Sequence, residues 1–277
     1  MERKDTETRR ASIWRWLFSG LPAYTAWVVA NLFVLVFLPV LFVVSLFDRK
    51  AGYPRLNLFG SIFARVFFVK LLSALRVHDF AHLPDSREVR VRQPCIFVAN
   101  HRSWLDALFA LALFPGARIP VKESYVNAPI LGWIIRWIGC IPLDSSSRRS
   151  VKEALDVARD YLSRGTSLFV FPEGTRARGT DLLPFADVFF RLAIEADLPV
   201  VPVVIHSDRP CMGPRHQSML TSRPATWRIR LLPPLERDRR DRASDLSRMA
   251  SRSLSRQLGE LDVKCEAWRT DTSEEVG

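Results

Sequence analysis

A histidine and an aspartate five positions apart are the side chains in this sequence best suited to acid–base chemistry. His101 and Asp106 belong to the segment NHRSWLD, which directly follows the apolar run Cys95–Ala99. On a continuous helix, residues five apart lie about 140° apart around the axis and do not face each other. They can meet if His101 lies in a strand-to-helix turn and Asp106 lies in the first turns of the helix that follows.

The chemistry open to such a pair is proton transfer. An aspartate that accepts a hydrogen bond from one imidazole nitrogen fixes the tautomer and stabilises the imidazolium, so the other nitrogen can take a proton. Ser103 is expected to cap the helix, and the mechanism needs no serine or cysteine nucleophile. On spacing alone, a structural histidine that caps a turn accounts for the pattern just as well.

The loop FPEGTR, residues 171–176, is the second candidate, and it also leaves an apolar run. Gly174 permits a close turn. Backbone N–H groups, the Thr175 hydroxyl and the Arg176 guanidinium would form a cradle for an oxyanion or a phosphate. An ordinary exposed turn is the alternative. The sequence contains neither the P-loop pattern nor the dinucleotide-binding pattern G-x-G-x-x-G.

Alternating strands and helices are predicted to position both loops. Apolar runs predict strands at 95–99, 167–171 and 200–205, and the alternating run 227–232 predicts an edge or half-exposed strand. Helices are expected from a capping box at 150–153 to Gly165, and over 184–196. The expected fold class is α/β, with a largely parallel central sheet flanked by helices. Such sheets bind ligands at the carboxyl ends of their strands.

An N-terminal membrane-associated helical segment is predicted before this domain. No charged residue occurs between Arg15 and Asp48, and residues 27–47 are apolar enough to span a bilayer as a helix. Both flanks are basic, so a single span and a re-entrant hairpin stay open, with a buried core helix as the alternative. Residues 56–76 are apolar with three interspersed cations, which is typical of a helix at the membrane interface.

Composition narrows the class of protein further. The formal net charge of +11 fits attraction to anionic lipid headgroups better than nucleic-acid binding, because the cations are scattered and no nucleic-acid motif occurs. Four cysteines without a C-x-x-C pair exclude zinc-ribbon and thioredoxin-type sites. His78 and His82 are four apart, and the favoured interpretation is a pair of surface histidines rather than metal ligands.

The order of the motifs resembles that of the glycerolipid acyltransferase family, in particular its 1-acylglycerol-3-phosphate acyltransferase-like members. The resemblance covers roughly residues 75–235 and rests on NHRSWLD, on Lys122-Glu123 before a hydrophobic helix and a glycine, on FPEGTR, and on a late strand with an internal Pro202. It implies that His101 and Asp106 form a catalytic dyad. It also implies that the FPEGTR loop binds the phosphate region of the acyl acceptor. The residues expected to contact substrate are Arg102, Ser103, Lys122, Glu173, Gly174, Thr175 and Arg176.

Two departures from the family pattern concern the acceptor. Pro142 and Ser145 stand where the family's second motif usually carries an aromatic residue and an arginine, and Arg148 or Arg149 is expected to supply the missing charge. Residues 186–187 are Ala-Asp where a basic pair is usual. These changes bear on lysophosphatidate recognition and leave acyl transfer as the expected chemistry.

The resemblance implies a membrane-bound enzyme that moves a fatty acyl group from acyl-CoA or acyl-carrier protein to the hydroxyl of a lysophospholipid, above all 1-acylglycerol-3-phosphate. The expected partners are this donor, the lysophospholipid acceptor and membrane lipids, with no nucleic acid, no metal and no other cofactor. The expected location is the inner (cytoplasmic) membrane, with the catalytic domain facing the cytoplasm. The predicted segments are a membrane anchor (1–52), an interfacial helix and connection (53–88), the α/β acyltransferase domain (89–235), and a basic helix and tail (236–277).

Other functions stay open. The acceptor could be a different lyso-lipid or hydroxylated lipid, the dyad could serve a hydrolase or transacylase, and the chain could be a catalytically silent lipid-binding membrane protein. Trp133 and Trp137, one helical turn apart, are expected to line an acyl groove or to contact the membrane, with an ordinary core helix as the alternative.

Overall fold

The computed structural model describes residues 54–71, 78–92, 94–129, 131–209 and 225–263, with the single positions Val28, Val43, Ser73 and Cys211. The predicted membrane anchor, residues 1–52, lies outside these ranges except for two positions. Within the described ranges, no helix combines the length and the apolar character needed to cross a bilayer.

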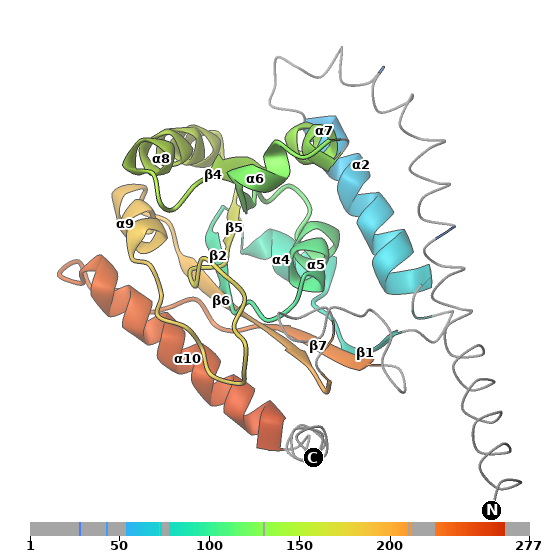
Figure 1. Cartoon of the computed structure of the whole chain (residues 1–277). Coiled ribbons are helices and arrows are strands. Elements are labelled where there is room, and N and C mark those ends of the chain that lie inside the picture. Colours follow the sequence, from blue (N-terminus) through green and yellow to red (C-terminus); the bar gives the residue numbers. More distant parts are fainter. Residues whose placement is uncertain are drawn as a thin grey trace, which may run out of the picture.

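Five strands form the central sheet in the order β1-β7-β6-β2-β5 (Figure 1). They are β1 (His78–His82), β2 (Ile96–Ala99), β5 (Leu168–Val170), β6 (Val200–Ser207) and β7 (Ala225–Leu231). β2 runs parallel to both β5 and β6, and β1 runs parallel to β7, whereas β6 and β7 are antiparallel. The predicted α/β fold with a largely parallel sheet is confirmed. β7 is half-exposed as expected, but it is not an edge strand because β1 covers it.

A second, two-stranded parallel sheet continues the first. It contains β3 (Pro120–Lys122) and β4 (Ile141–Leu143). Just before β3, the Arg118 amide donates to the Ser167 carbonyl at 2.9 Å, and the Phe169 amide donates to the Arg118 carbonyl at 2.9 Å. These bonds place β3 beside β5, so the end of β3, where Lys122 lies, belongs to the same edge as the ends of β2 and β5.

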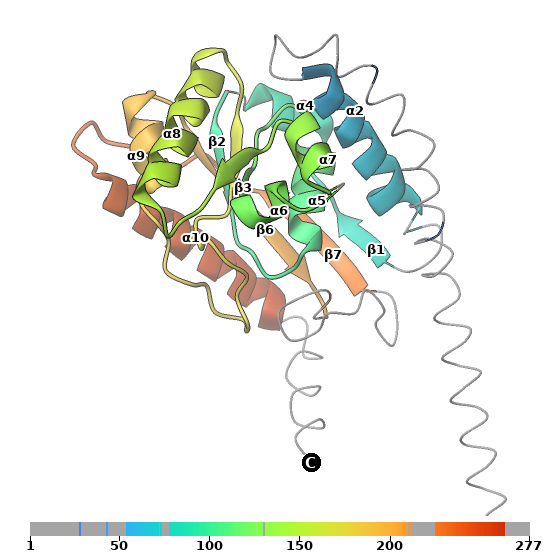
Figure 2. The ribbon, with the colours of Figure 1, turned by 45° about the horizontal axis from the view of Figure 1, so that its top comes forward.

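Helices cover both faces of the sheet (Figures 1 and 2). On one face lie α2 (Pro54–Ala64), the π-helix η2 (Arg65–Leu71), α4 (Ser86–Val91) and α5 (Leu105–Leu113). On the other lie α8 (Arg148–Ser163), α9 (Val188–Glu195) and α10 (Ala243–Val263), while the short helices α6 (Glu123–Val126) and α7 (Leu131–Trp137) join β3 to β4. Because side chains alternate along a strand, Phe97 packs into the α5 core, whereas Ile96 and Val98 pack into the α8–α10 core.

The helix boundaries depart from prediction in two places. α8 begins at Arg148, and its N-cap is Ser147, whose side chain accepts from the Ser150 amide at 3.3 Å. The predicted capping box at 150–153 is therefore wrong by most of a turn. The predicted end is confirmed, because Gly165 has the positive φ of +75° that favours glycine after a helix. α9 begins at Val188, four residues later than expected.

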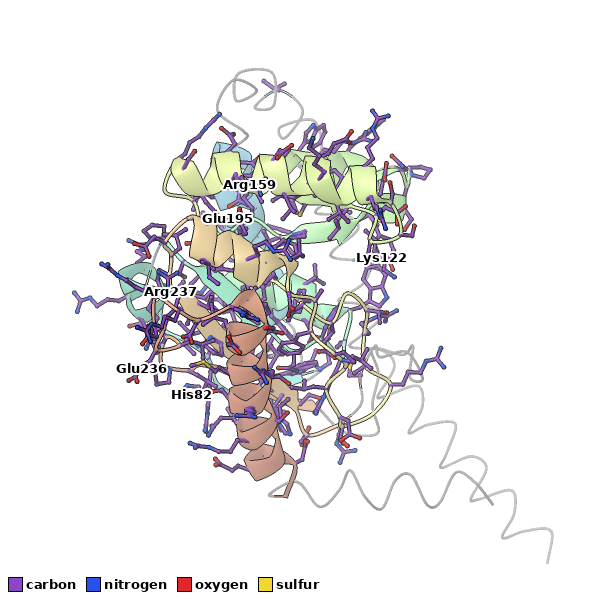
Figure 3. All side chains as sticks on the ribbon, turned by 90° about the vertical axis from the view of Figure 1, so that its left-hand side faces the viewer. His82, Lys122, Arg159, Glu195, Glu236 and Arg237 are labelled. Carbon is purple, nitrogen blue, oxygen red and sulfur yellow. The ribbon has the colours of Figure 1, made fainter. Side chains whose placement is uncertain are left out.

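The C-terminal basic helix contributes to the core. In α10, the apolar residues recur every three or four positions, and Leu246, Ala250, Leu254, Leu258 and Leu261 are all buried in the second core. Its neighbours on this face are also tied together, since Arg159 of α8 and Glu195 of α9 form an ion pair at 2.9 Å (Figure 3). α10 is thus one wall of the domain, with its basic side chains on the outer surface.

The predicted interfacial helix packs against the domain on one face and exposes apolar side chains on the other. On its inner face, the side-chain amide of Asn57 (Nδ2) donates to the Ile138 carbonyl at 2.7 Å. Gly60 lies so close to Ile138 that a Cβ on Gly60 would meet the Ile138 side chain at 2.8 Å. On its outer face, Leu58, Ile62 and Val66 are exposed. Lying at a membrane interface remains a prediction, and this exposed apolar face is compatible with it.

Candidate active site

The two candidate loops meet at the carboxyl ends of adjacent parallel strands. His101 follows β2, Asp106 lies in the first turn of α5, and Glu173 follows β5. β2 and β5 are in register, with Val98 opposite Val170, so the loops that leave them start side by side. This is the edge at which open α/β sheets bind ligands.

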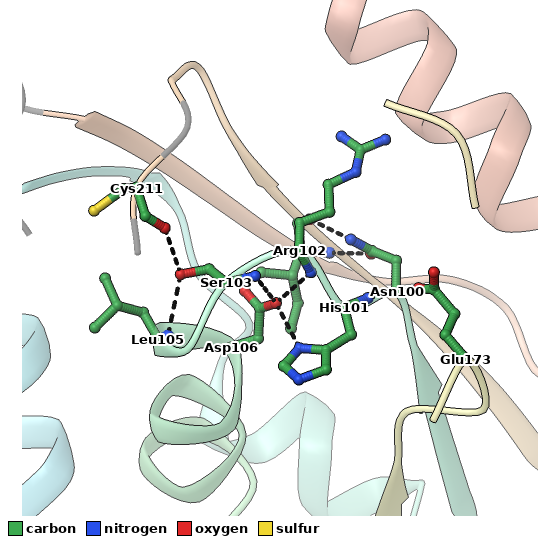
Figure 4. Close-up of polar contacts among 9 residues, drawn as sticks. Asn100, His101, Arg102, Ser103, Leu105, Asp106, Glu173 and Cys211 are labelled. Atoms are coloured by element: carbon green, nitrogen blue, oxygen red, sulfur yellow. Dashed lines mark hydrogen bonds and ion pairs between the residues drawn. The ribbon is translucent and has the colours of Figure 1, made fainter. Parts of the chain in front are cut away.

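The His101–Asp106 pair has the geometry of a catalytic dyad (Figure 4). The His101 Nδ1 lies 2.9 Å from the Asp106 Oδ2, and the same oxygen accepts from the amides of Arg102 and Ser103, each at 2.7 Å. A carboxylate only accepts, so the proton between the side chains lies on Nδ1, and Nε2 is left unprotonated in the neutral ring. Nε2 makes no hydrogen bond to a described residue.

The imidazole is also fixed through its face. Its ring stacks on Phe171 with 4.2 Å between centroids and 25° between planes, and Phe171 in turn contacts Phe169 in the core. The ring is therefore held by a carboxylate at its edge and by a phenyl group on its face. Its side chain is 18% exposed while that of Asp106 is 1% exposed, so only the imidazole of the dyad can meet a substrate.

Glu173 fastens the two loops to each other. Its Oε1 accepts from the His101 amide at 2.7 Å, and its Oε2 accepts from the Leu183 amide at 2.9 Å. Burial raises the pKa of Glu173, although these two amide donors act in the opposite direction. The Ala177 amide donates to the His101 carbonyl at 2.8 Å, so the peptide on each side of His101 is held. A direct contact of Glu173 with the acceptor stays a prediction.

Arg176 lies against the aromatic residue at the start of α5. Its guanidinium carbon is 5.3 Å from the centre of the Trp104 ring, a cation–π distance, and Trp104 contacts Tyr125 of α6 edge-on at 4.7 Å. Lys122 is exposed and immediately precedes α6. One chain of contacts therefore joins the FPEGTR loop, the dyad helix and the end of β3. Gly174 adopts a φ of +66°, which explains the glycine in the motif.

Arg102 and Ser103 have partners inside the protein. The Arg102 guanidinium donates to the Thr180 carbonyl and lies 3.5 Å from the Asp262 carboxylate of α10. The Ser103 hydroxyl accepts from the Leu105 amide at 3.1 Å and donates to the Cys211 carbonyl at 2.7 Å. The N-cap of α5 is Trp104, one residue after the expected Ser103, although the Ser103 hydroxyl does accept from the amide of the first helical residue. Contact of either the Arg102 or the Ser103 side chain with substrate stays a prediction.

The start of α8 is not brought to the dyad. Arg148 and Arg149 are exposed, and Arg149 forms an ion pair with Glu153 at 2.7 Å on the same helix. Neither arginine contacts a residue of the dyad or of the FPEGTR loop in the described part of the chain. Their role as substitutes for the missing arginine at Ser145 stays a prediction.

Sequence reasoning missed a second buried network beside the dyad. His206, at the end of β6, lies with its Nε2 3.0 Å from the Asp262 Oδ1, and Asp262 also meets Arg102. Burial alone would raise the pKa of Asp262, but the hydrogen bond from His206 and the charge of Arg102 outweigh it and hold that pKa below its usual value. The only sequence signal was the position of His206 at the end of an apolar strand.

The described residues give little support to a metal site or to a cysteine nucleophile. They contain no group of three or more potential metal ligands. His78 and His82 lie on a strand, and the expected pair of surface histidines is wrong for His78, which is buried, whereas His82 is exposed. Burial raises the pKa of Cys95, Cys140 and Cys211 to about 12, so these thiols stay protonated near neutral pH. Protonated thiols are poor nucleophiles.

The sequence of this chain is similar to those of known acyltransferases. Residues 75–206 match the family model described as Acyltransferase. The chain is 30% identical over 164 residues to a chloroplastic 1-acyl-sn-glycerol-3-phosphate acyltransferase (BAT2) of Brassica napus, covering 56% of this chain and 46% of that protein. It is 34% identical over 129 residues to a 1-acyl-sn-glycerol-3-phosphate acyltransferase of Saccharomyces cerevisiae, covering 45% and 43%. It thus spans about half the length of such curated relatives.

The fold has a solved counterpart. The crystal structure of the 1-acyl-sn-glycerophosphate (LPA) acyltransferase PlsC from Thermotoga maritima superimposes with a TM-score of 0.71. The match covers 89% of this chain and 97% of that chain, at 21% sequence identity. At this identity the likeness establishes a shared fold.

Proposed function

We propose that this chain belongs to the glycerolipid acyltransferase family and moves a fatty acyl group from an acyl thioester to the free hydroxyl of a lysophospholipid, because residues 75–206 match the Acyltransferase family model and its similar relatives are 1-acyl-sn-glycerol-3-phosphate acyltransferases. The observation that carries the proposal is the 2.9 Å contact between His101 Nδ1 and Asp106 Oδ2. It supplies an oriented general base at the carboxyl edge of the sheet, beside the FPEGTR loop.

The proposed reaction is direct transfer. The Nε2 of His101 takes the proton of the acceptor hydroxyl while that oxygen attacks the thioester carbonyl carbon. The tetrahedral intermediate collapses, the C–S bond breaks, and the thiolate leaves with the proton from the imidazolium. Asp106 stabilises the imidazolium through this cycle, and general-base catalysis of this kind contributes about 10²–10⁴-fold. No covalent acyl-enzyme forms.

The proposed acceptor is 1-acylglycerol-3-phosphate. Its support is the activity for which the relatives are named, together with Arg176 against Trp104 at the start of α5 and the exposed Lys122 at the end of β3. Arginine binds phosphate through paired, charge-assisted hydrogen bonds, and lysine binds it as a point charge. A different lyso-lipid acceptor remains the second candidate, because Ser145 and Ala186 stand where the family usually carries cations.

The proposal includes a membrane location. The supporting features are the uncharged run before Asp48 and the exposed apolar residues of α2 and α7, including Trp133. A membrane-bound enzyme can take an acceptor directly from the lipid surface. We place the catalytic domain on the cytoplasmic side, where either acyl-CoA or acyl-carrier protein serves as the donor.

The decisive experiment is an acceptor panel with the full-length chain in detergent or vesicles. Each assay contains one labelled acyl thioester, offered as acyl-CoA or acyl-carrier protein, and one acceptor. We expect thiol release that depends on 1-acylglycerol-3-phosphate and labelled diacyl product in equal amount. Thiol release without acceptor would instead identify a hydrolase, and binding without any release would identify a lipid-binding protein.

A further inference from the structure

The dyad depends on the backbone next to His101. Asp106 keeps its Oδ2 on the imidazole only while the amides of Arg102 and Ser103 point at the same oxygen, both at 2.7 Å. Three consecutive residues must therefore curve around one carboxylate atom. Small displacements matter here, because a misplacement of about 1 Å can cost about 10²-fold in rate.

Each residue in this curve, and Asn100 just before it, has its own anchor. Asn100 exchanges two side-chain hydrogen bonds with the backbone of Ile205, and the His101 amide is held by Glu173. The Ser103 hydroxyl is held by the Cys211 carbonyl. The remaining residue, Arg102, is anchored on the opposite face of the sheet, by the Thr180 carbonyl and by Asp262.

Asp262 is held in place by His206 of strand β6. Its Oδ1 lies 3.0 Å from the Nε2 of His206, whose side chain is completely buried, while its Oδ2 faces Arg102 at 3.5 Å. The two carboxylate oxygens thus serve two different partners. α10 carries Asp262 and is itself fixed by a row of buried leucines that includes Leu258 and Leu261.

We propose that Asp262 is a positioning residue for the dyad, acting through Arg102. The inference rests on the proposed acyltransferase function. It assigns Arg102 to the protein's own support and not to substrate, and it makes the C-terminal helix a part of the catalytic apparatus. Asp262 touches neither substrate nor His101, so its effect falls on the rate of the chemical step and not on substrate binding.

The test compares four variants of the full-length chain: Asp262→Asn, Arg102→Met, the double variant, and Glu260→Gln. The last is the matched control, an acid-to-amide change two residues away whose ion pair with Arg256 lies on the helix surface. We expect Asp262→Asn to lower kcat about tenfold while the KM of donor and acceptor stays within about twofold. Glu260→Gln should leave both constants unchanged.

Two further readouts separate positioning from general weakening. If Asp262 acts through Arg102, the double variant loses no more kcat than the worse single variant, because the two changes break one connection. In hydrogen exchange, the Arg102 and Ser103 amides should exchange faster in Asp262→Asn than in Glu260→Gln, and this measurement needs no activity. Arg102→Met probes the same connection without altering α10.

The outcomes distinguish the inference from the proposed function. If the wild-type chain transfers no acyl group but Asp262→Asn loosens the 102–103 amides, the proposed function fails and the support by Asp262 stands. If the wild type is active and Asp262→Asn matches it in kcat and exchange, the inference is overturned. A lower melting temperature with unchanged kcat and unchanged loop exchange also overturns it.

Discussion

The described part of the chain contains two His–Asp pairs with nearly equal separations, and the buried partner is the aspartate in one pair and the histidine in the other. His101 and Asp106 lie 2.9 Å apart, with the imidazole 18% exposed and the carboxylate 1% exposed. His206 and Asp262 lie 3.0 Å apart, with the imidazole fully buried and the carboxylate 18% exposed. In each pair the histidine ends or follows a central strand and the aspartate lies on a helix that covers the sheet.

The difference lies in what else each carboxylate holds. Asp106 accepts from two neutral backbone amides, so its negative charge remains available to stabilise a protonated His101. Asp262 faces the cation of Arg102, which offsets that charge. A His–Asp contact therefore does not by itself indicate catalysis. We expect two features to decide whether a pair transfers a proton or only stabilises the fold. They are the exposure of the histidine side chain and the charge of the other groups that contact the carboxylate.

Removing the exposed imidazole should have the largest effect. We expect His101→Ala to lower kcat about 10²–10⁴-fold, because it removes the general base, while the melting temperature changes little. Acyl transfer by the purified variant is the measurement, and His82→Ala, an exposed histidine on β1, is the control. Near-wild-type turnover of His101→Ala would show that the His101–Asp106 pair does not supply the general base.

Changing the carboxylate of the same pair should come next. Asp106→Asn loses the charge that stabilises the imidazolium and can favour the wrong tautomer, so kcat should fall about 10²-fold or more. The pH profile of kcat/KM is the informative measurement. The neutral amide stabilises a protonated imidazole less well than the carboxylate does, so the profile of the variant should differ from that of the wild type. An unchanged rate and profile would mean that His101 acts alone.

Arg176, the cation of the FPEGTR loop, should affect acceptor binding more than the rate. Arg176→Ala should raise the acceptor KM about tenfold or more, as expected for the loss of a charge-assisted contact with phosphate, with little change in the donor KM. Arg178→Ala, an exposed arginine two residues along the same loop, is the control. An effect confined to the donor KM would reassign the FPEGTR loop to the thioester's carrier.

The buried imidazole should matter more for stability than for rate. His206→Ala leaves one oxygen of Asp262 without its partner in a largely buried site, which should reduce the free energy of unfolding by about 1–3 kcal/mol. In the folded fraction, kcat should fall less than in Asp262→Asn, because Arg102 keeps its carboxylate. Denaturant titration and acyl transfer measure the two effects. A rate loss equal to that of His101→Ala would contradict the division of roles.

The smallest expected effect is a pH dependence. The pKa of Asp262 is lowered in the folded chain, so its ionised form contributes stability above the unfolded value of about 3.9, and that contribution is lost as pH falls through the folded value. Melting curves between pH 6 and 3 should therefore fall less steeply in Asp262→Asn than in Glu260→Gln. Parallel curves would show that Asp262 is not held as an ion.

The fold and the first pair could be predicted from the sequence because their signals are local. Continuous apolar runs marked β2, β5 and β6, and a histidine directly after such a run faced an aspartate five residues later. β1, which contains His78 and His82, was missed because its five residues, HDFAH, form neither a continuous apolar run nor a regular alternation. The start of α8 shifted because Ser147, and not Ser150, accepts the capping bond, while Ser150 binds the Asp144 amide. The start of α9 follows Asp187, whose side chain makes no capping bond that sequence could have marked.

The second pair could not be predicted because it depends on long-range packing. His206 and Asp262 are separated by 56 residues, and only the folding of α10 onto the sheet brings them together. Likewise, the NHRSWLD pattern gave no sign that Arg102 meets Thr180 and Asp262, which lie far along the chain. Side-chain direction within a tight turn is set by tertiary contacts that spacing does not encode.

The strand order also bears on the timing of folding. β1 lies at the edge of the described sheet with β7 as its neighbour, so His78 pairs with Ala225 across most of the domain. A chain made from its amino end exposes β1 to solvent long before β7 exists. Closing so long a loop costs conformational entropy, and pairing of this kind slows folding. The β1 edge is thus expected to be the last to become native, after the sheet beneath the dyad has formed.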